Sequence, residues 1–256
     1  MSLTSKNMHK VIVSSEKEVV QRLTTEIKKC AKIALNERGV FRVGLSGGSV
    51  LNYLCEAIPN IDTELEKWKF FFCDERFVPD YDAESTFGAY KKKLLSCTSL
   101  KLEQFVCINT EISLAECAKD YEEKILKEFQ LEYGAVPQFD LLLLGMGPDG
   151  HTCSLFPGHT LLAERERIIA PIDDSPKPPP QRVTMTFPLI NNARCCIFAM
   201  CGVGKAEMVK RVFIDKEELP AGMVAPKHGN LICIFDEASC LGRKAPRTFS
   251  PNVSPG

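Results

Sequence analysis

The chain alternates short apolar segments with amphipathic segments of helical period, and this alternation restricts the fold more than any other feature. Between the apolar segments, hydrophobic residues recur three and four positions apart, which is typical of helices with one buried face. The apolar segments lack polar alternation, so both faces of each strand are expected to be covered. The segments expected to form these strands are 10–14, 41–45, 68–74, 104–108, 139–145, 195–202 and 231–235. The pattern predicts an α/β fold with a doubly wound, mostly parallel sheet and helices on both faces.

Capping signals place two of the helices. Ser15 with Glu18, and Ser113 with Glu116, form S-x-x-E capping boxes ahead of helical apolar patterns. The first pattern runs to Gly39, and glycine is a common residue just after a helix. Further helices are expected after the SGGS stretch, around 84–95, and after residue 204.

Two segments depart from this regular pattern. Residues 182–187, RVTMTF, alternate apolar and polar side chains, which predicts a half-exposed strand that is antiparallel or lies at an edge. The proline-rich stretch 173–182 is either an interdomain linker or a rigid surface loop. The segment after it supplies only two strands and one firm helix, so a loop is favoured. We therefore predict one domain over residues 1–242, followed by a flexible tail at 243–256.

Composition excludes several classes of partner. The net charge is −1, so the chain lacks the basic excess of nucleic-acid-binding proteins. The basic run Lys91–Lys93 lies among apolar residues at helical spacing and is expected to be the solvated face of a helix. No stretch approaches the roughly 18 apolar residues of a membrane span. We expect neither a nucleic-acid partner nor a membrane partner.

The chain has 12 cysteines, but they are scattered and form no CxxC pair. Zinc-site spacing is therefore absent, and no metal site is predicted. Several cysteines lie in apolar segments, which indicates buried free thiols and a reducing compartment. Together with an N-terminus that lacks an apolar signal region, this predicts a cytoplasmic protein.

Polar and glycine-rich residues follow four of the predicted strands. Ser46-Gly47-Gly48-Ser49 follow the second strand and Asp74-Glu75-Arg76 follow the third. Residues 145–152 follow the strand at 139–145, and Lys205 lies beyond the strand at 195–202. Ligands of open parallel sheets bind at the carboxyl ends of the strands. These residues are therefore expected to converge on one site.

The SGGS turn is suited to an oxyanion, because glycines let backbone N–H groups approach a ligand at a partly positive helix N-terminus. The alternative is a tight strand-to-helix turn with a serine cap. Arg76 and Lys205 favour the oxyanion, since each can donate a charge-assisted hydrogen bond to a phosphate. The alternative for these cations is an ion pair with Asp74 or Glu75.

His151 lies in the glycine-rich loop GMGPDGH, for which two functions were weighed. Gly145, Gly147 and Gly150 fit the dinucleotide fingerprint G-x-G-x-x-G. However, Pro157 ends any following helix too early for the usual βαβ unit. An imidazole at neutral pH can instead accept a proton. Since no serine elbow G-x-S-x-G is present, we expect His151 to activate water as a general base.

Several segments resemble the 6-phosphogluconolactonase family. The resemblance is carried by LSGGS (45–49), CDERFVP (73–79), GMGPDGHTCSLFPGH (145–159), SPKPPPQRVTMTFP (175–188) and GKAEMVKRV (204–212). It implies a modified Rossmann-like sheet of the kind shared with the related sugar-phosphate isomerases, and the activity of a carboxylic ester hydrolase. The implied reaction is hydrolysis of 6-phospho-D-glucono-1,5-lactone to 6-phosphogluconate in the oxidative pentose phosphate pathway, without metal or organic cofactor.

The resemblance also assigns roles to individual residues. His151 corresponds to the base that activates water, and Asp149 is expected to orient or tune it. The phosphate-binding residues would be Ser46, Gly47, Gly48, Arg76 and Lys205, with Arg182 as a further contact. The partner would be a small sugar-phosphate lactone, and the protein a monomer or a weak homo-oligomer.

Two other functions remain open at this point. Glucosamine-6-phosphate deaminase/isomerase shares the DGH loop, but its loop continues to an acidic residue, whereas here it continues Ser154-Leu155-Phe156-Pro157. A non-catalytic sugar-phosphate sensor could retain the sheet and the phosphate site without turnover. Loss of the histidine would mark such a sensor, and His151 is present.

Overall fold

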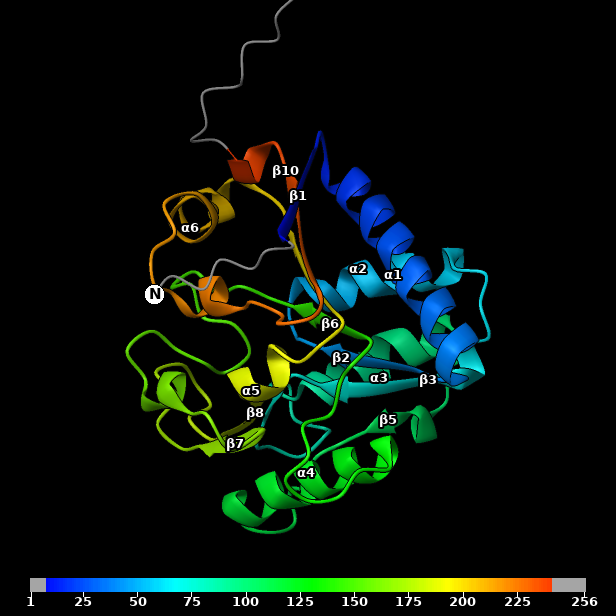
Figure 1. The fold of residues 1–256 in the computed structure, drawn as a ribbon, viewed down its shortest axis with the longest axis vertical. Coiled ribbons are helices and arrows are strands. Elements are labelled where there is room, and N and C mark those ends of the chain that lie inside the picture. The colour runs from blue at the N-terminus through cyan, green and yellow to red at the C-terminus, as the bar shows by residue number, and fades with distance from the viewer. Residues whose placement is uncertain (1–7, 241–256) are drawn as a thin grey trace, which may run out of the picture.

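The computed structural model describes residues 8–240, and its centre is a seven-stranded sheet in the order β1-β10-β9-β6-β2-β3-β5 (Figure 1). Every neighbouring pair in this sheet is parallel. The strands are β1 (Met8–Val13), β2 (Phe41–Leu45), β3 (Trp68–Phe72), β5 (Phe105–Val106), β6 (Leu141–Leu144), β9 (Cys195–Met200) and β10 (Asn230–Asp236). The predicted α/β class and the parallel sheet are confirmed.

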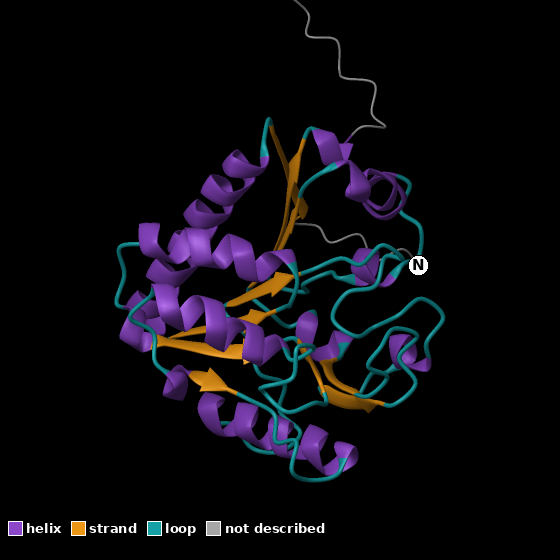
Figure 2. Ribbon diagram, turned by 180° about the vertical axis from the view of Figure 1, so that it is seen from behind, coloured by secondary structure: helices purple, strands orange, loops and turns teal. Residues whose placement is uncertain are grey.

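Helices cover both faces of the sheet, as predicted. One face carries α1 (Glu16–Arg38), α2 (Ser49–Ala57) and α3 (Thr86–Cys97), which lie in front of the strands in Figure 2. The other face carries α4 (Leu114–Phe129), α5 (Phe187–Ile190) and α6 (Ala206–Val209), which continues as a π-helical turn over Lys210–Ile214. Short 3₁₀ turns lie at Ile58–Asn60, Leu65–Lys67, Leu102–Gln104, Thr160–Ala163, Val203–Lys205, Pro220–Met223 and Ala238–Cys240.

Successive side chains of β6 explain why this strand is entirely apolar. Leu141 and Leu143 point into the core beneath α1, α2 and α3, and Leu142 and Leu144 point into the core on the opposite face. All four are 2% exposed or less. A strand buried on both faces reads as a continuous hydrophobic run, because neither set of alternating positions meets water.

The two helix starts lie where the capping signals predicted. The hydroxyl of Ser15 accepts a hydrogen bond from Glu18 N, and α1 ends at Arg38, just before Gly39, whose φ is +69°. At α4 the box is reciprocal: Ser113 Oγ accepts from Glu116 N, and Glu116 Oε2 accepts from Ser113 N. Each bond satisfies a backbone group that the helix itself leaves unpaired.

A second sheet, which the sequence pattern did not predict, shares the core on the α4 side of the main sheet. It is antiparallel, in the order β4 (Asp74–Arg76), β8 (Arg182–Met185), β7 (Ile169–Ile172). The prediction that 182–187 is antiparallel is confirmed, but the prediction of a half-exposed strand is wrong. β8 is the central strand and all its residues are buried. Its polar positions tolerate burial because Thr184 Oγ1 bonds to the backbone of Ser154 and Met185.

The order of the strands creates a switch point between β2 and β6. From β2 the chain proceeds outward to β3 and β5, and then returns to β6 on the opposite side of β2 before adding β9 and β10. The connections on the two sides therefore diverge, which leaves a crevice at the carboxyl ends of β2 and β6. The backbone is joined there by a hydrogen bond from Ser46 N to Leu143 O, 3.1 Å long.

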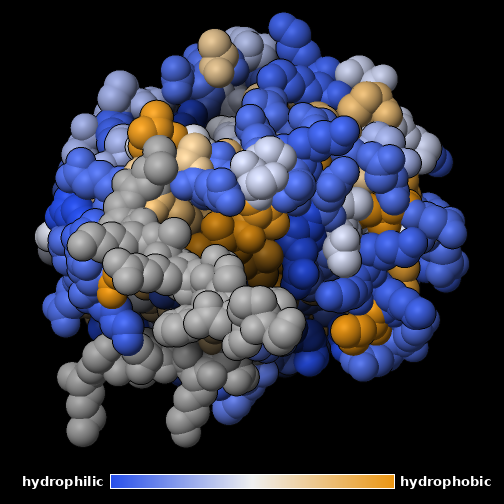
Figure 3. All heavy atoms as spheres, turned by 90° about the horizontal axis from the view of Figure 1, so that it is seen from above, coloured by the Kyte–Doolittle hydropathy of each residue, from blue (hydrophilic) through white to orange (hydrophobic). Residues whose placement is uncertain are grey.

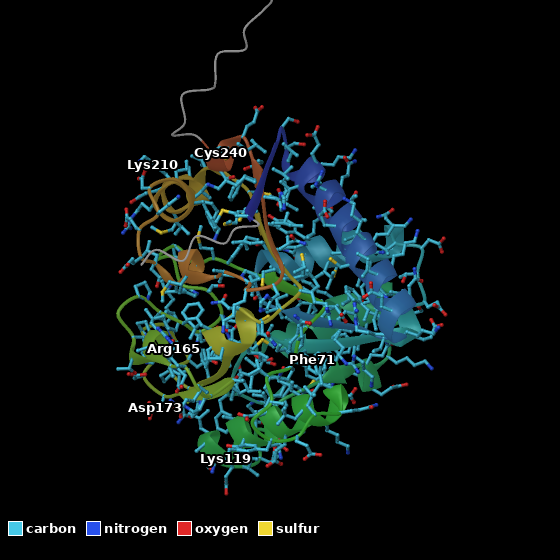
Figure 4. All side chains as sticks on the ribbon, viewed as in Figure 1. Phe71, Lys119, Arg165, Asp173, Lys210 and Cys240 are labelled. Carbon is cyan, nitrogen blue, oxygen red and sulfur yellow. The ribbon has the colours of Figure 1, made fainter. Side chains whose placement is uncertain are left out.

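Apolar side chains fill the interior, and most charged side chains lie at the surface. In Figure 4, Phe71 lies within the molecule, whereas Lys119 on α4 and Arg165 lie at its periphery. The face seen in Figure 3 is mostly hydrophilic. Lys91–Lys93 are exposed on α3, as predicted. No helix among residues 8–240 has the length and apolarity needed to cross a bilayer.

All 12 cysteines are free thiols, and six of them are buried, as predicted. The stretch 173–182 is a loop that leads from β7 to β8. The assignment of a single domain stays a prediction. The predicted tail at 243–256 lies outside the described residues.

Candidate active site

A cavity of about 190 Å³ opens at the switch point, and all four predicted polar segments contribute to its wall. The predicted residues that line it are Ser46, Gly47, Gly48, Arg76, His151, Arg182 and Lys205. Asp149 does not line the cavity, but it contacts His151 from behind. Residues more than a hundred positions apart thus share one cleft, because parallel strands place their carboxyl ends along the same edge.

The SGGS turn connects β2 directly to α2. Gly48 has φ +70°, a conformation that favours glycine, and α2 begins at the next residue. Ser46 is 4% exposed, and its hydroxyl has no hydrogen-bonding partner among the described residues. Buried hydroxyls are nearly always paired, so an unpaired one in a cavity wall is available to a ligand.

Arg76 and Lys205 reach the cavity from two different sides. Arg76 is the last residue of β4, and its guanidinium donates to Glu84 O at 2.8 Å and pairs with Glu84 Oε2 at 3.3 Å. Arg76 therefore pairs with Glu84, and the alternative of an ion pair between Arg76 and Asp74 or Glu75 is wrong. Lys205 Nζ donates to the carbonyl of Met146 at 2.6 Å. Burial, together with the charge of nearby Lys177, lowers the pKa of Lys205.

The ring of His151 is fixed on two sides. Its Nδ1 lies 2.5 Å from Asp149 Oδ1, and its face packs against Phe156, with ring centroids 4.7 Å apart. Gly147 leaves room for the ring, since a Cβ there would lie 2.0 Å from His151 Cε1. No described residue hydrogen-bonds to Nε2. This nitrogen is therefore the one available to a substrate or a water molecule in the cavity.

The charge states of this pair follow from their surroundings. Burial tends to raise the pKa of Asp149, but hydrogen bonds from His151 and Lys177 outweigh it and lower that pKa to about 2. Burial lowers the pKa of His151, with a smaller lowering from Lys177, while Asp149 opposes both. At neutral pH the result is an ionised carboxylate beside a neutral imidazole, the form in which a histidine can accept a proton.

The sequence pattern missed Lys177. It lies in the proline-rich loop, and its Nζ is 3.0 Å from Asp149 Oδ1 and 3.2 Å from His151 Nδ1. A loop of this composition is expected to face solvent, so nothing in the spacing predicted a contact with the loop that carries Asp149 and His151. The available signal was a lone lysine within SPKPPP, a segment already noted for its family resemblance.

A contact between two buried polar residues at the site was also missed. Asp74 lines the cavity and accepts a hydrogen bond from Ser154 Oγ at 2.7 Å. Ser154 lies three residues after His151, so this bond ties the loop after β6 to β4. Asp74 was expected to converge on the site with Glu75 and Arg76, but the only role weighed for it was that of an ion-pair partner for a neighbouring cation.

Arg182 has a different environment from that of a free phosphate-binding side chain. It is 3% exposed and lies 5.7 Å from the centre of the Phe156 ring. Its Nε and Nη2 donate to the carbonyl oxygens of residues 177–179, and its Nη1 donates to Ser154 Oγ at 3.5 Å. A guanidinium has five N–H groups, so at most one remains for a ligand.

The comparisons with known proteins agree with this geometry. The family model described as "Glucosamine-6-phosphate isomerases/6-phosphogluconolactonase" matches residues 14–233. The 6-phosphogluconolactonase of Homo sapiens is 47% identical over 236 residues, which cover 89% of this chain and 91% of that protein. A protein described as "Probable 6-phosphogluconolactonase" from Drosophila melanogaster is 46% identical over 231 residues, with 89% and 92% coverage.

Solved structures show the same architecture. The 6-phosphogluconolactonase from Trypanosoma cruzi superposes with a TM-score of 0.80 at 26% identity, covering 95% of this chain and 98% of that one. The match includes both sides of the switch point, since it spans nearly the whole of each chain. With the family model covering most of the sequence and relatives near 47% identity, this chain belongs to the glucosamine-6-phosphate isomerase/6-phosphogluconolactonase family.

Proposed function

We propose that this chain is a carboxylic ester hydrolase that converts 6-phospho-D-glucono-1,5-lactone to 6-phospho-D-gluconate, with His151 as general base toward water. The activity is that of the relatives it resembles over about nine-tenths of its length. The observation that carries the histidine's role is the placement of His151 in the cavity wall, with Nδ1 held by Asp149 and Nε2 without a described partner.

The reaction follows from this placement. Nε2 takes a proton from a water molecule, whose oxygen attacks the lactone carbonyl and forms a tetrahedral oxyanion. The carbon–oxygen bond to the ring oxygen then breaks, and the protonated His151 returns its proton to the leaving oxygen. Asp149 orients the ring and stabilises the imidazolium that exists between the two proton transfers.

The phosphate of the substrate would lie at the opposite wall, against Ser46, Gly47, Gly48, Arg76 and Lys205. A helix N-terminus with glycine amides, an unpaired buried hydroxyl and two cations together form an anion site. Arg182 contributes at most its remaining N–H, so its main part in this proposal is to hold the proline-rich loop.

The loop after His151 argues against the deaminase alternative. Residues 154–157 supply no carboxylate, and Ser154, Leu155 and Phe156 are each 1% exposed or less. They pack as core and leave no acid there for opening a sugar ring. The retained His151–Asp149 pair likewise argues against a sensor without turnover.

The direct test is a lactonase assay on freshly generated 6-phosphogluconolactone in mildly acidic buffer, which suppresses spontaneous hydrolysis. We expect turnover above the spontaneous rate with the wild-type protein and almost none with His151→Asn. Release of ammonia from glucosamine 6-phosphate would instead support the deaminase, and binding of NADP in a titration would support a dehydrogenase. Ligand binding with no turnover of any of these would support the sensor.

We further propose a cytoplasmic enzyme, monomeric or weakly self-associating, that needs no metal or organic cofactor and binds neither nucleic acid nor membrane. Twelve free thiols suit a reducing compartment. The net charge of −1 is unsuited to a polyanion partner. Among residues 8–240, no group of three or more His, Cys, Asp or Glu side chains is arranged to hold a metal ion.

A further inference from the structure

Lys177 contacts both members of the proposed catalytic pair, although it belongs to a different loop. Its Nζ lies 3.0 Å from Asp149 Oδ1 and 3.2 Å from His151 Nδ1, on the side of the ring that faces away from Nε2. Lys177 is not among the residues that line the cavity. Its ammonium is therefore placed to act on the base, while the substrate lies on the other side of the ring.

The proline-rich loop holds Lys177 in this position through several hydrogen bonds. Arg182 donates to the carbonyl oxygens of Lys177, Pro178 and Pro179. Ser175 Oγ donates to Lys177 O at 2.9 Å and accepts from Lys177 N at 3.3 Å. The side chain of Lys177 is about one-third exposed, and its backbone N–H and carbonyl are both hydrogen-bonded within the loop.

The start of the same loop is tied to the segment that follows the catalytic histidine. His159 Nε2 lies 2.9 Å from Asp174 Oδ1, and His159 Nδ1 accepts from Leu161 N at 3.1 Å. The label of Asp173 in Figure 4 marks where this loop begins, at the edge of the molecule near β7. The loop thus runs from the surface inward, and Lys177 meets the Asp149–His151 pair.

We propose that Lys177 is a positioning residue of the reaction, whose ammonium shares the carboxylate of Asp149 with the imidazole of His151 and so keeps that imidazole neutral between turnovers. This inference rests on the proposed function. Asp149 and His151 belong to the same loop, and Lys177 adds a residue from the proline-rich loop to this pair.

The chemistry of the three groups supports this role. Nδ1 of a neutral imidazole either donates or accepts, so with Nε2 free to take a proton, Nδ1–H donates to Asp149. Lys177 then donates to the same carboxylate oxygen and leaves it less negative charge with which to stabilise an imidazolium. When His151 takes a proton from water, two positive charges lie about 3 Å apart. That repulsion favours prompt return of the proton to the leaving oxygen.

Other charged groups near His151 do not duplicate this effect. Asp149 from its own loop and Asp74 from β4 both favour the protonated ring. Arg76, Arg182 and Lys205 line the cavity, but each has its own oxygen partners at Glu84, the proline-rich loop and Met146. Among the described residues, Lys177 is the cation whose nitrogen lies within hydrogen-bond distance of the ring.

The test compares Lys177→Met, which removes the charge, with Lys177→Arg, which retains it. The first readout is the NMR titration of the His151 ring, assigned among the four histidines with His151→Asn. We expect the titration midpoint to rise in Lys177→Met and to stay near the wild-type midpoint in Lys177→Arg. The second readout is kcat/KM, which should fall about tenfold at pH 6 and less than about twofold at pH 8 in Lys177→Met, because only the acidic condition protonates the altered base.

Lys92→Met is the matched control, since Lys92 is exposed on α3 and forms no described hydrogen bond or ion pair. It should leave both readouts unchanged. If Lys177→Met does not fold, Lys177→Gln also removes the charge but keeps a hydrogen-bond donor, and the same rise is expected.

Two results would overturn the proposal. One is an unchanged His151 midpoint in the charge-removing variants. The other is a higher KM with the same kcat at both pH values, which would make Lys177 a substrate contact. The titration needs no substrate, so it separates this inference from the proposed function. Absence of lactone turnover in the wild type would end the proposed function and leave the titration result standing.

Discussion

His151 Nδ1 lies 2.5 Å from Asp149 Oδ1, a contact between two residues of the same tight loop. Gly150, which separates them, has φ +82°, and this backbone conformation turns both side chains to one side. The bond orients the ring and fixes the tautomer with a free Nε2. Asp149→Asn should therefore lower kcat by about 10²-fold or more, with little change in KM, because the amide can hold the ring in the wrong tautomer.

Steady-state kinetics over several substrate concentrations would check this split. Asp62→Asn is a suitable control, since Asp62 is exposed in the loop before β3. An Asp149→Asn enzyme with normal kcat would show that Asp149 only stabilises the turn.

Arg76 provides a test of where the phosphate binds. A charge-assisted hydrogen bond contributes about 1.5–3 kcal/mol, so Arg76→Ala should raise KM for the phosphorylated lactone about 10- to 100-fold. The unphosphorylated glucono-1,5-lactone should be affected less than about threefold. Because Arg76 also pairs with Glu84, Glu84→Gln is the control that removes the ion pair and keeps the guanidinium. Equal losses for the two lactones would contradict the phosphate assignment.

The main sheet could be predicted from the sequence because strands buried on both faces have a recognisable sequence pattern. Each parallel strand reads as an apolar run, and each crossover helix carries its own period and cap. The strands of the antiparallel sheet have no such sequence pattern. β4 has only three residues, and β7 contains Pro171, which argues against a strand. Thr184 of β8 was expected to face solvent, because alternation does not show whether a hydroxyl meets water or a buried backbone group.

The site was predictable to the extent that it lies at strand ends. His151, Arg76 and Lys205 each follow a predicted strand, so topology alone brings them to one edge. Lys177 follows no such strand. It reaches the site because Arg182 folds the proline-rich loop inward, and that interaction depends on a buried guanidinium whose partners are backbone carbonyls. Unlike a helix cap, this contact between a guanidinium and loop carbonyls has no recognisable sequence pattern.

Glu75 is a buried carboxylate whose charge depends on pH in the physiological range. It is 3% exposed and accepts hydrogen bonds from the backbone N–H groups of Arg76, Thr86 and Phe87. Burial outweighs these donors and raises the pKa of Glu75 from 4.5 to about 7. The folded state thus keeps a proton that the unfolded chain releases, so stability is greatest below pH 4.5 and declines as the pH rises to 7.

The decline attributable to Glu75 should be on the order of 3 kcal/mol between pH 4.5 and pH 7.5. Urea unfolding of wild type and Glu75→Gln at several pH values would measure it, because the amide does not titrate. As the pH rises, the free energy of unfolding of the wild type should fall relative to that of Glu75→Gln. Glu103→Gln, at an exposed position, controls for the background pH dependence. A difference that does not vary with pH would mean that the three N–H donors hold Glu75 ionised throughout.

Gly147 allows the proposed role of the His151 ring to be tested without removing that ring. A Cβ at this residue would lie 2.0 Å from Cε1 and 2.1 Å from Nδ1 of His151, so Gly147→Ala must displace the ring. A misplacement of about 1 Å can cost 10²-fold in rate, and we expect a loss of kcat of about that size.

Gly145→Ala in the same loop is the matched comparison. Its Cβ would meet only Ser46 Cβ, at 3.8 Å, which is an ordinary contact, so it should lose far less activity. Thermal unfolding of both variants would separate displacement of the ring from general destabilisation. If Gly147→Ala retained full activity with a normally folded loop, the reaction would not depend on the ring position seen here, and His151 could not be the base. A selective loss in Gly147→Ala would instead tie turnover to the position of a single imidazole.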